Sequence, residues 1–230
     1  MSAAAILRRL RGLGSPARGV ASFFKTGPGE YGEGDRFLGV TVPVIRRLTR
    51  EYRNAPERTV LSLLRSEWHE ARLLALCLLA DRHERGDDHE RKRVFALYLR
   101  HRVRINNWDL VDASAAQIAG PHLRRGNRGL RARLARSPRL WDRRIAVVST
   151  YHDIRLGEFD PTLRLARHLL DDQEDLIHKA VGWMLREVGK RDRRTLERFL
   201  ATHASRMPRT MLRYAIERFP EPARRRYLRA

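Results

Sequence analysis

The chain has 230 residues, of which 42% are hydrophobic and 33% are charged, and these proportions exclude an intrinsically disordered protein. Its 48 Lys and Arg residues outnumber its 27 Asp and Glu residues, which gives a formal net charge of +21. Such a basic excess favours a polyanionic partner, namely DNA, RNA or an anionic membrane surface.

The N-terminal segment, residues 1–25, contains many Arg residues and no acidic residue. This composition is also that of a mitochondrial transit peptide. We favour a basic amphipathic helix over residues 3–13, because the apolar residues there have helical spacing and no processing signal follows.

A Gly-rich segment at residues 25–36 contains four Gly residues and one Pro, and is a poor helix candidate. It lacks the GK[ST] ending of a P-loop, and its three acidic residues would repel phosphate. We therefore expect an ordered loop between helices, at the rim of a binding groove, rather than a nucleotide site.

Helical periodicity dominates the rest of the chain. Apolar residues recur at spacings of three and four in residues 60–64, 72–80, 94–99 and 163–170, and no segment alternates convincingly as a strand would. Gly and Pro fall between these runs. The sequence therefore predicts an all-α fold.

We expect the basic C-terminal end, residues 220–227, to be solvated and unstructured.

Cys77 is the only cysteine, so no intrachain disulfide can form. It lies in an apolar helical run, which indicates a buried structural thiol rather than a nucleophile. No apolar run approaches the ~20 residues that a membrane-spanning helix needs. We expect a cytoplasmic, nucleoid-associated protein that does not use a membrane.

Five helix openings resemble one another, at residues 67–74, 107–114, 140–147, 176–183 and 207–214. Their irregular period of roughly 32–40 residues suits stacked helix pairs of the HEAT or armadillo kind. We expect residues 1–230 to form a single curved solenoid domain with a concave basic face, acting as a monomer. The charged residues that recur near these openings would line that face: Arg72, Asp112, Arg144 and Lys179.

Trp108 and Asp112 are the most informative pair in the chain. They are four residues apart, so on a helix they project from the same face. An indole would then lie beside a carboxylate in a strongly basic protein. This pairing points to chemistry at a developing positive charge, and hence toward nucleic acid and a sugar cation.

Three further motifs accompany this pair: residues 37–43 (FLGVTVP), 140–146 (LWDRRIA) and 179–187 (KAVGWMLRE). In this set and spacing the chain resembles the AlkD family of HEAT-like-repeat DNA glycosylases over residues 23–219. The W-D-x-V-D and K-A-[IV]-G-W-x-L-R-E stretches are specific to that family, whereas the leucine-rich remainder is not.

The resemblance implies excision of cationic N3- and N7-alkylpurines from duplex DNA, without metal, cofactor or obligate protein partner. It places the catalytic Asp at Asp112, two groove tryptophans at Trp108 and Trp183, and a phosphate-binding Arg at Arg144. Where the family has a tyrosine before its first Lys, this chain has Phe23, so that hydroxyl is missing. Members of the family engage the DNA backbone around the lesion without a deep base pocket.

The chemistry of this reaction agrees with these residue types. An alkylated purine already carries positive charge and leaves readily, so positive charge develops on the deoxyribose. The Asp112 carboxylate would stabilise this oxocarbenium character and orient the attacking water. Indole faces favour a nearby cation, and Arg144 can bind a phosphate in bidentate fashion. We expect Arg186, Arg46 and Lys179 to supply supporting DNA contacts.

Two other functions remain open from the sequence. One is a noncatalytic HEAT-repeat module that binds branched or bent DNA by shape and charge. The other is a HEAT-type scaffold for protein partners or RNA, whose concave face should lack the acid–indole pair. The sequence does not reveal the preferred lesion or whether the base is flipped.

Overall fold

A computed structural model describes residues 2–15, 23–125 and 128–229 of the chain. The predicted all-α class is confirmed, because these residues form helices and no strand beyond an isolated bridge between Arg36 and Trp68. They group into two compact units, Met1–Ile118 and Ala119–Ala230, and each unit is described by itself. A single domain over the whole chain stays a prediction.

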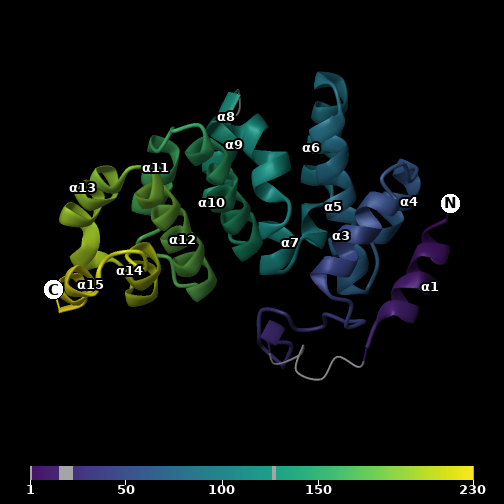
Figure 1. Cartoon of the computed structure of the whole chain (residues 1–230), viewed down its shortest axis with the longest axis horizontal. Coiled ribbons are helices and arrows are strands. Elements are labelled where there is room, and N and C mark those ends of the chain that lie inside the picture. Colours follow the sequence, from purple (N-terminus) through teal and green to yellow (C-terminus); the bar gives the residue numbers. More distant parts are fainter. Residues whose placement is uncertain (1, 16–22, 126–127, 230) are drawn as a thin grey trace. The chain divides into compact units, whose positions relative to one another are not determined.

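Unit 1 is built around α5. Its helices are α1 (Ala3–Leu13), α3 (Val42–Glu51), α4 (Glu57–Leu64), α5 (His69–Arg85), α6 (Asp88–Arg100) and α7 (Trp108–Asp112) (Figure 1). Helices α3, α4, α6 and α7 all pack on α5, and ten of its first eleven residues are buried. A helix that is covered on every side loses the usual apolar stripe and becomes a core element.

The predicted N-terminal helix is confirmed as α1. The Ser2 hydroxyl caps it by accepting a hydrogen bond from the Ala5 backbone N–H at 3.3 Å. Ile6 and Leu10 are buried where α1 packs against α4 and α5. The amphipathic pattern of the sequence thus anchors the basic segment to unit 1.

Cys77 lies within α5 as a partly exposed thiol. Burial raises the pKa of this thiol to about 11. Because the thiolate is the nucleophilic form, a thiol that stays protonated at neutral pH agrees with the structural role expected from the sequence.

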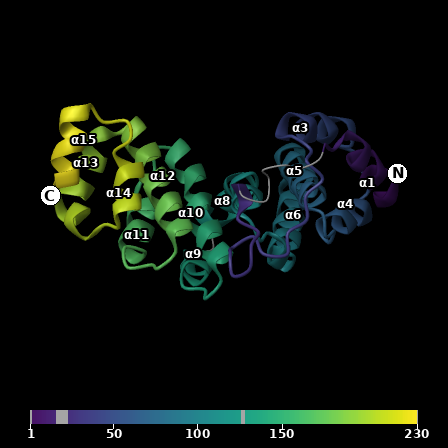
Figure 2. The same ribbon diagram turned by 90° about the horizontal axis from the view of Figure 1, so that it is seen from below.

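Unit 2 consists of two rows of helices. The first row is α9 (Arg128–Ala135), α11 (Asp160–His168) and α13 (Arg193–His203), and the second is α10 (Leu140–Arg155), α12 (Asp175–Arg191) and α14 (Arg209–Ala215). Figure 2 shows the second row side by side, and α8 (Gly120–Arg125) precedes both rows. The first-row helices pack on α10 and α12, which are the central elements of this unit.

Gly182 allows α12 and α14 to approach each other closely. A Cβ atom at this position would lie 2.5 Å from the Met211 carbonyl oxygen and 2.5 Å from Tyr214 Cβ. Any larger residue would therefore push the two helices apart. The Gly of the K-A-V-G-W motif has a packing reason that does not involve a ligand.

The prediction of an unstructured C-terminal end is wrong, because α15 spans Glu221–Arg229. Glu221 pairs with Arg224 at 3.2 Å and with Arg225 at 3.0 Å, one helical turn later. The Tyr227 ring also contacts Phe219, with centroids 5.8 Å apart. These contacts offset the mutual repulsion of the basic side chains.

In the described residues, no helix is long and apolar enough to cross a membrane.

Candidate functional site

Trp108 and Asp112 occupy the first and last residues of α7, as the sequence predicts. The Asn107 side chain begins this helix, because its Oδ1 accepts the Trp108 backbone N–H at 2.8 Å. Between them, Leu110 and Val111 are fully buried and anchor the turn in the core. Trp108 and Asp112 themselves are partly exposed, so the carboxylate is not sealed in the interior.

The chain immediately after α7 is irregular. Residues Ala115–Ala119 form a π-helix, a distortion found frequently at functional sites. The buried Ser114 hydroxyl donates to the Leu110 carbonyl at 2.6 Å and contacts the Tyr98 hydroxyl at 3.2 Å. These bonds hold α7 against α6, which stabilises a helix of only five residues.

An aromatic stack covers one face of Trp108. Phe24 stacks on the indole with centroids 5.4 Å apart and on Phe37 at 4.8 Å, and Phe37 stacks on His69 at 4.5 Å. Phe23 meets the indole edge-on at 5.7 Å and is 64% exposed. The sequence reasoning missed this stack, although the adjacent aromatics before the Gly-rich segment were a visible signal.

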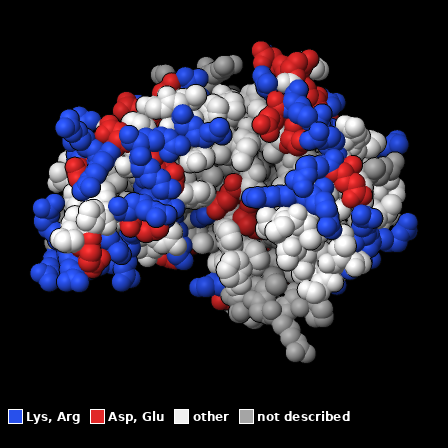
Figure 3. All heavy atoms as spheres, in the orientation of Figure 1, with Lys and Arg blue, Asp and Glu red and all other residues white. Residues whose placement is uncertain are grey.

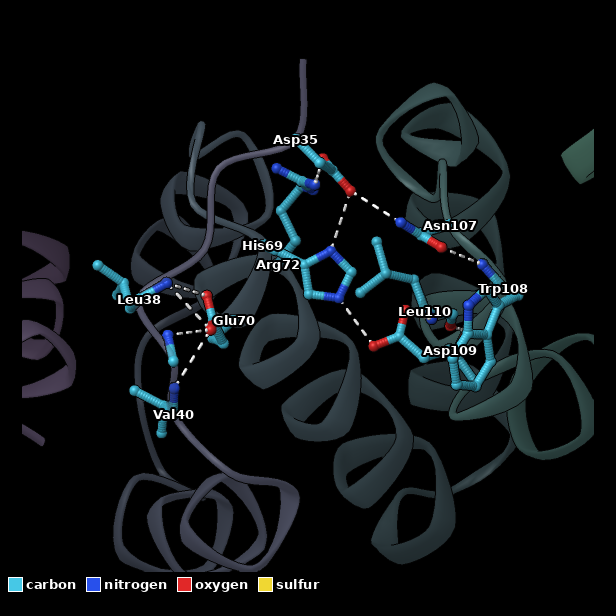
Figure 4. Close-up of polar contacts among 12 residues, drawn as sticks. Asp35, Leu38, Val40, His69, Glu70, Arg72, Asn107, Trp108, Asp109 and Leu110 are labelled. Atoms are coloured by element: carbon cyan, nitrogen blue, oxygen red, sulfur yellow. Dashed lines mark hydrogen bonds and ion pairs between the residues drawn. The ribbon is translucent and has the colours of Figure 1, made fainter. Parts of the chain in front are cut away.

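A buried charge network lies beside α7 and is centred on His69, the first residue of α5 (Figure 4). His69 Nδ1 lies 3.1 Å from Asp35 Oδ2, and Nε2 lies 2.7 Å from Asp109 Oδ2. Arg72 also pairs with Asp35, which in addition accepts from Asn107 Nδ2 at 3.0 Å. The network thus joins the Gly-rich loop, α5 and α7.

The network holds its groups charged. Burial by itself would lower the pKa of His69, but the hydrogen bonds and charges of Asp109 and Asp35 raise that pKa to about 9. Burial would raise the pKa of Asp35, but hydrogen bonds from His69 and Asn107 and the charge of Arg72 lower it. At neutral pH both ring nitrogens of His69 therefore donate to carboxylates.

This network corrects one expectation about the row of charged residues. Arg72 is only 4% exposed and is paired with the buried Asp35, so it does not line an open face. Its other guanidinium contacts are the backbone carbonyls of Ser66 and Glu67, each at 3.1 Å. Arg72, the charged residue of the first repeat, therefore has a structural role, because it pairs with Asp35 of the Gly-rich loop.

A second buried carboxylate explains the FLGVTVP motif. Glu70, which is 4% exposed, accepts the backbone N–H groups of Leu38, Gly39 and Val40 at distances of 2.7–3.2 Å. Gly39 has φ of +76°, a conformation that L side chains rarely adopt. The expected ordered loop at residues 25–36 is confirmed, and Glu70 and Asp35 fix where it ends.

Three residues predicted to contact DNA share one face of α12. Lys179, Trp183 and Arg186 are spaced by four and three residues, and all three are partly exposed. Lys179 pairs with Asp175 at 2.7 Å, and Arg186 pairs with Glu217. Phosphate binding by either cation would require exchange of these carboxylate partners.

The remaining predicted residues differ in their exposure. Arg144 is only 5% exposed, so like Arg72 it does not line an open face as the repeat predicts. Its Nη1 donates to the Leu176 carbonyl at 2.6 Å, across from α10 to the start of α12. Arg46 is exposed on α3 in unit 1. Unit 1 thus holds Arg46, Trp108 and Asp112, whereas unit 2 holds Arg144 and the three α12 residues.

No group of three His, Cys, Asp or Glu side chains in the described chain could hold a metal ion.

Comparison with known proteins shows the family. A model of the DNA alkylation repair enzyme family matches residues 6–219. The chain belongs to this family. Membership indicates a role in the repair of alkylated DNA, and hence a DNA substrate. No curated protein matches the sequence.

A solved structure shares the fold. It is described as a predicted DNA alkylation repair enzyme from Enterococcus faecalis, with a TM-score of 0.68 and 18% sequence identity. The match covers 89% of this chain and 95% of that one. The helical-repeat fold of this repair family is therefore the fold of the chain.

Proposed function

We propose that this family member is an AlkD-like DNA glycosylase that hydrolyses the N-glycosidic bond of cationic N3- and N7-alkylated purines in duplex DNA. The observation that carries the proposal is the pair at the two ends of α7. Trp108 and Asp112 are partly exposed, while Leu110 and Val111 between them are fully buried. A carboxylate on an anchored turn beside an indole suits a reaction whose transition state is a sugar cation.

Asp112 is assigned the central role. Loss of the alkylated purine leaves positive charge on C1′ and O4′ of the deoxyribose, and the carboxylate stabilises that charge. The same oxygen atoms accept a hydrogen bond from the attacking water. The bond from C1′ to the purine nitrogen breaks, the water oxygen bonds to C1′ as the new hydroxyl, and the proton that the water loses passes to the carboxylate and then to solvent. The alkylated purine is positively charged before cleavage and departs as a neutral base with the electrons of the C1′–N bond, so the site needs no general acid to protonate it.

The aromatic stack limits how Trp108 can act. Phe24 covers one face of the indole at 5.4 Å and Phe23 meets the ring at 5.7 Å, so only the part of the opposite face and edges that Phe23 leaves uncovered remains for the nucleotide. Contact through that uncovered face would place the electron-rich ring next to the developing cation. The missing tyrosine hydroxyl is replaced by the exposed Phe23 ring, which contributes apolar contact alone.

Unit 2 is assigned to DNA binding. Lys179, Trp183 and Arg186 form a mixed cationic and aromatic face of α12 that suits a sugar–phosphate backbone. Arg144 would exchange its bond to the Leu176 carbonyl for a phosphate oxygen, or orient α12 through that bond. In unit 1, the exposed Arg46 would add a peripheral phosphate contact.

The decisive experiment measures release of 7-methylguanine and 3-methyladenine from methylated duplex DNA. We expect the wild-type protein to release the free base and leave an abasic site in the presence of a chelator. Asp112→Asn should reduce the excision rate by at least about a hundredfold, the scale of one preorganised electrostatic contact, and largely preserve DNA affinity.

The matched control is Asp88→Asn, which removes one carboxylate from a side chain that is 80% exposed on α6. This variant should retain full activity. Full excision by Asp112→Asn would refute the catalytic assignment. DNA binding by the wild type without any base release would favour the noncatalytic module instead.

A further inference from the structure

Unit 2 carries a groove that none of the proposed glycosylase residues lines. It has a free volume of about 1100 Å³, slightly above the usual range for small-molecule sites. Its walls come from α8, α9, α11 and α13, together with the end of α10 and the turn that follows it. The feature is therefore separate from the excision chemistry.

The packing of unit 2 explains why this groove exists. Helices α9, α11 and α13 pack on α10 and α12, and their main contacts are not with one another. The groove lies between these helices. Its lining includes partly exposed apolar side chains that a ligand could cover, namely Ala132, Phe159 and Leu163.

Some of the basic residues in the groove are already neutralised. Arg131 pairs with the buried Asp153 at 2.7 Å, and Arg124 pairs with Glu158 at 2.5 Å. Arg164 lies 3.5 Å from Asp160. These pairs need no external anion.

Three other arginines of the groove differ from these. Arg136, Arg167 and Arg198 are exposed and form no ion pair with a carboxylate in the described parts of the chain. Arg198 donates instead to the Thr195 hydroxyl at 2.8 Å. Arg136 directly follows α9, Arg167 is near the end of α11, and Arg198 is at the middle of α13. These three guanidinium groups therefore give the groove positive charge that no ion pair within the described chain neutralises.

The titration of a neighbouring histidine supports this positive potential. His203 lines the groove and its ring contacts that of Phe199 in a tilted arrangement, with centroids 4.6 Å apart. Burial, followed by the charges of Arg167 and Arg206, lowers the pKa of His203. The part of this lowering that comes from Arg167 and Arg206 reflects positive charge close to the groove. Figure 3 shows Lys and Arg side chains gathered over this part of unit 2, around α11, α12 and α13.

We propose that the α9–α11–α13 groove binds an acidic peptide segment of another protein, with apolar side chains between its carboxylates. The carboxylates would pair with Arg136, Arg167 and Arg198, and the apolar side chains would cover the apolar lining. A combination of buried apolar contact and charge-assisted hydrogen bonds is what this surface offers.

Nucleic acid fits this surface less well. The outer surface of a duplex presents phosphates and sugars, and offers no apolar side chains to the groove lining. A single strand binds mainly by stacking its bases on exposed aromatic faces. Phe199 is only 6% exposed and its ring already contacts His203. That leaves Phe159 as a single partly exposed phenylalanine ring, which cannot stack successive bases.

The test uses the full-length protein and fluorescence anisotropy of a short labelled peptide in which Asp alternates with Leu and Phe. The triple variant Arg136→Gln, Arg167→Gln, Arg198→Gln should weaken peptide binding roughly tenfold, since exposed ion pairs are individually weak but act together here. The control triple variant Arg133→Gln, Arg194→Gln, Arg213→Gln removes the same charge from exposed positions outside the groove. It should bind the peptide nearly as the wild type does.

Three further results bear on the proposal. A peptide with Ser in place of Leu and Phe should bind more weakly. Equal binding of the two peptides would show that the groove binds anions without apolar contact, and would overturn the proposal. Equal losses in the two triple variants would do the same. Displacement of the peptide by single-stranded DNA, with a groove-specific loss of DNA affinity, would reassign the groove to nucleic acid. Excision of alkylated bases should be unchanged in the groove variant, so the outcome is independent of the glycosylase assignment.

Discussion

Unit 1 should lose stability as the pH rises from neutral toward about 9, because of the buried His69. The ordinary pKa of a His is 6.5, and the carboxylates of Asp35 and Asp109 raise the pKa of His69 to about 9 in the folded chain. A raised folded pKa means that the native state binds the proton more tightly. The stabilisation is therefore complete below about pH 6.5 and is lost as the pH passes through about 9.

The magnitude follows from the two pKa values. At about 1.4 kcal/mol for each pH unit between them, the protonated His69 contributes on the order of 3 kcal/mol to the free energy of unfolding. His69 is 1% exposed, so solvent screening does not reduce this figure. That amount is a large share of the stability of an ordinary domain.

The measurement is urea unfolding followed by circular dichroism at a series of pH values from about 6 to about 10. The wild type should lose roughly 3 kcal/mol across this series. His69→Gln should be destabilised at neutral pH and should lose most of that pH dependence. The control His89→Gln alters an exposed histidine of α6 and should follow the wild type. An unchanged pH dependence in His69→Gln would show that the network does not control the titration.

Two further variants test packing and polar anchoring. Gly182→Ala should destabilise the protein by about 1–3 kcal/mol in urea unfolding, because its Cβ would collide with the Met211 carbonyl, whereas Gly12→Ala in α1 meets nothing within 4 Å and should be neutral or slightly stabilising. Loss of stability in both variants alike would point to backbone effects instead. Glu70→Gln should cost about 2 kcal/mol, since a buried carboxylate that accepts three backbone N–H groups is replaced by an amide. The exposed Glu67→Gln is its control and should change stability little, and equal losses would contradict the anchoring role of Glu70.

The sequence alone determined the features that depend on local spacing. Helical periodicity gave the all-α class and the position of α1. The separation of four residues between Trp108 and Asp112 placed them on one turn, and the spacing of Lys179, Trp183 and Arg186 placed them on one face of α12. Such predictions succeed because a helix repeats every 3.6 residues whatever surrounds it.

Tertiary structure decided the environment of those residues. Asp35 and Asp109 are separated from His69 by 34 and 40 residues in the sequence, so no local pattern predicts the network. The same contacts bury Arg72, which the repeat alone assigns to an open face. Phe24 covers one face of Trp108 for the same reason. Burial and the charges brought near by folding set the energy of a polar or aromatic side chain, and both depend on segments distant in the sequence.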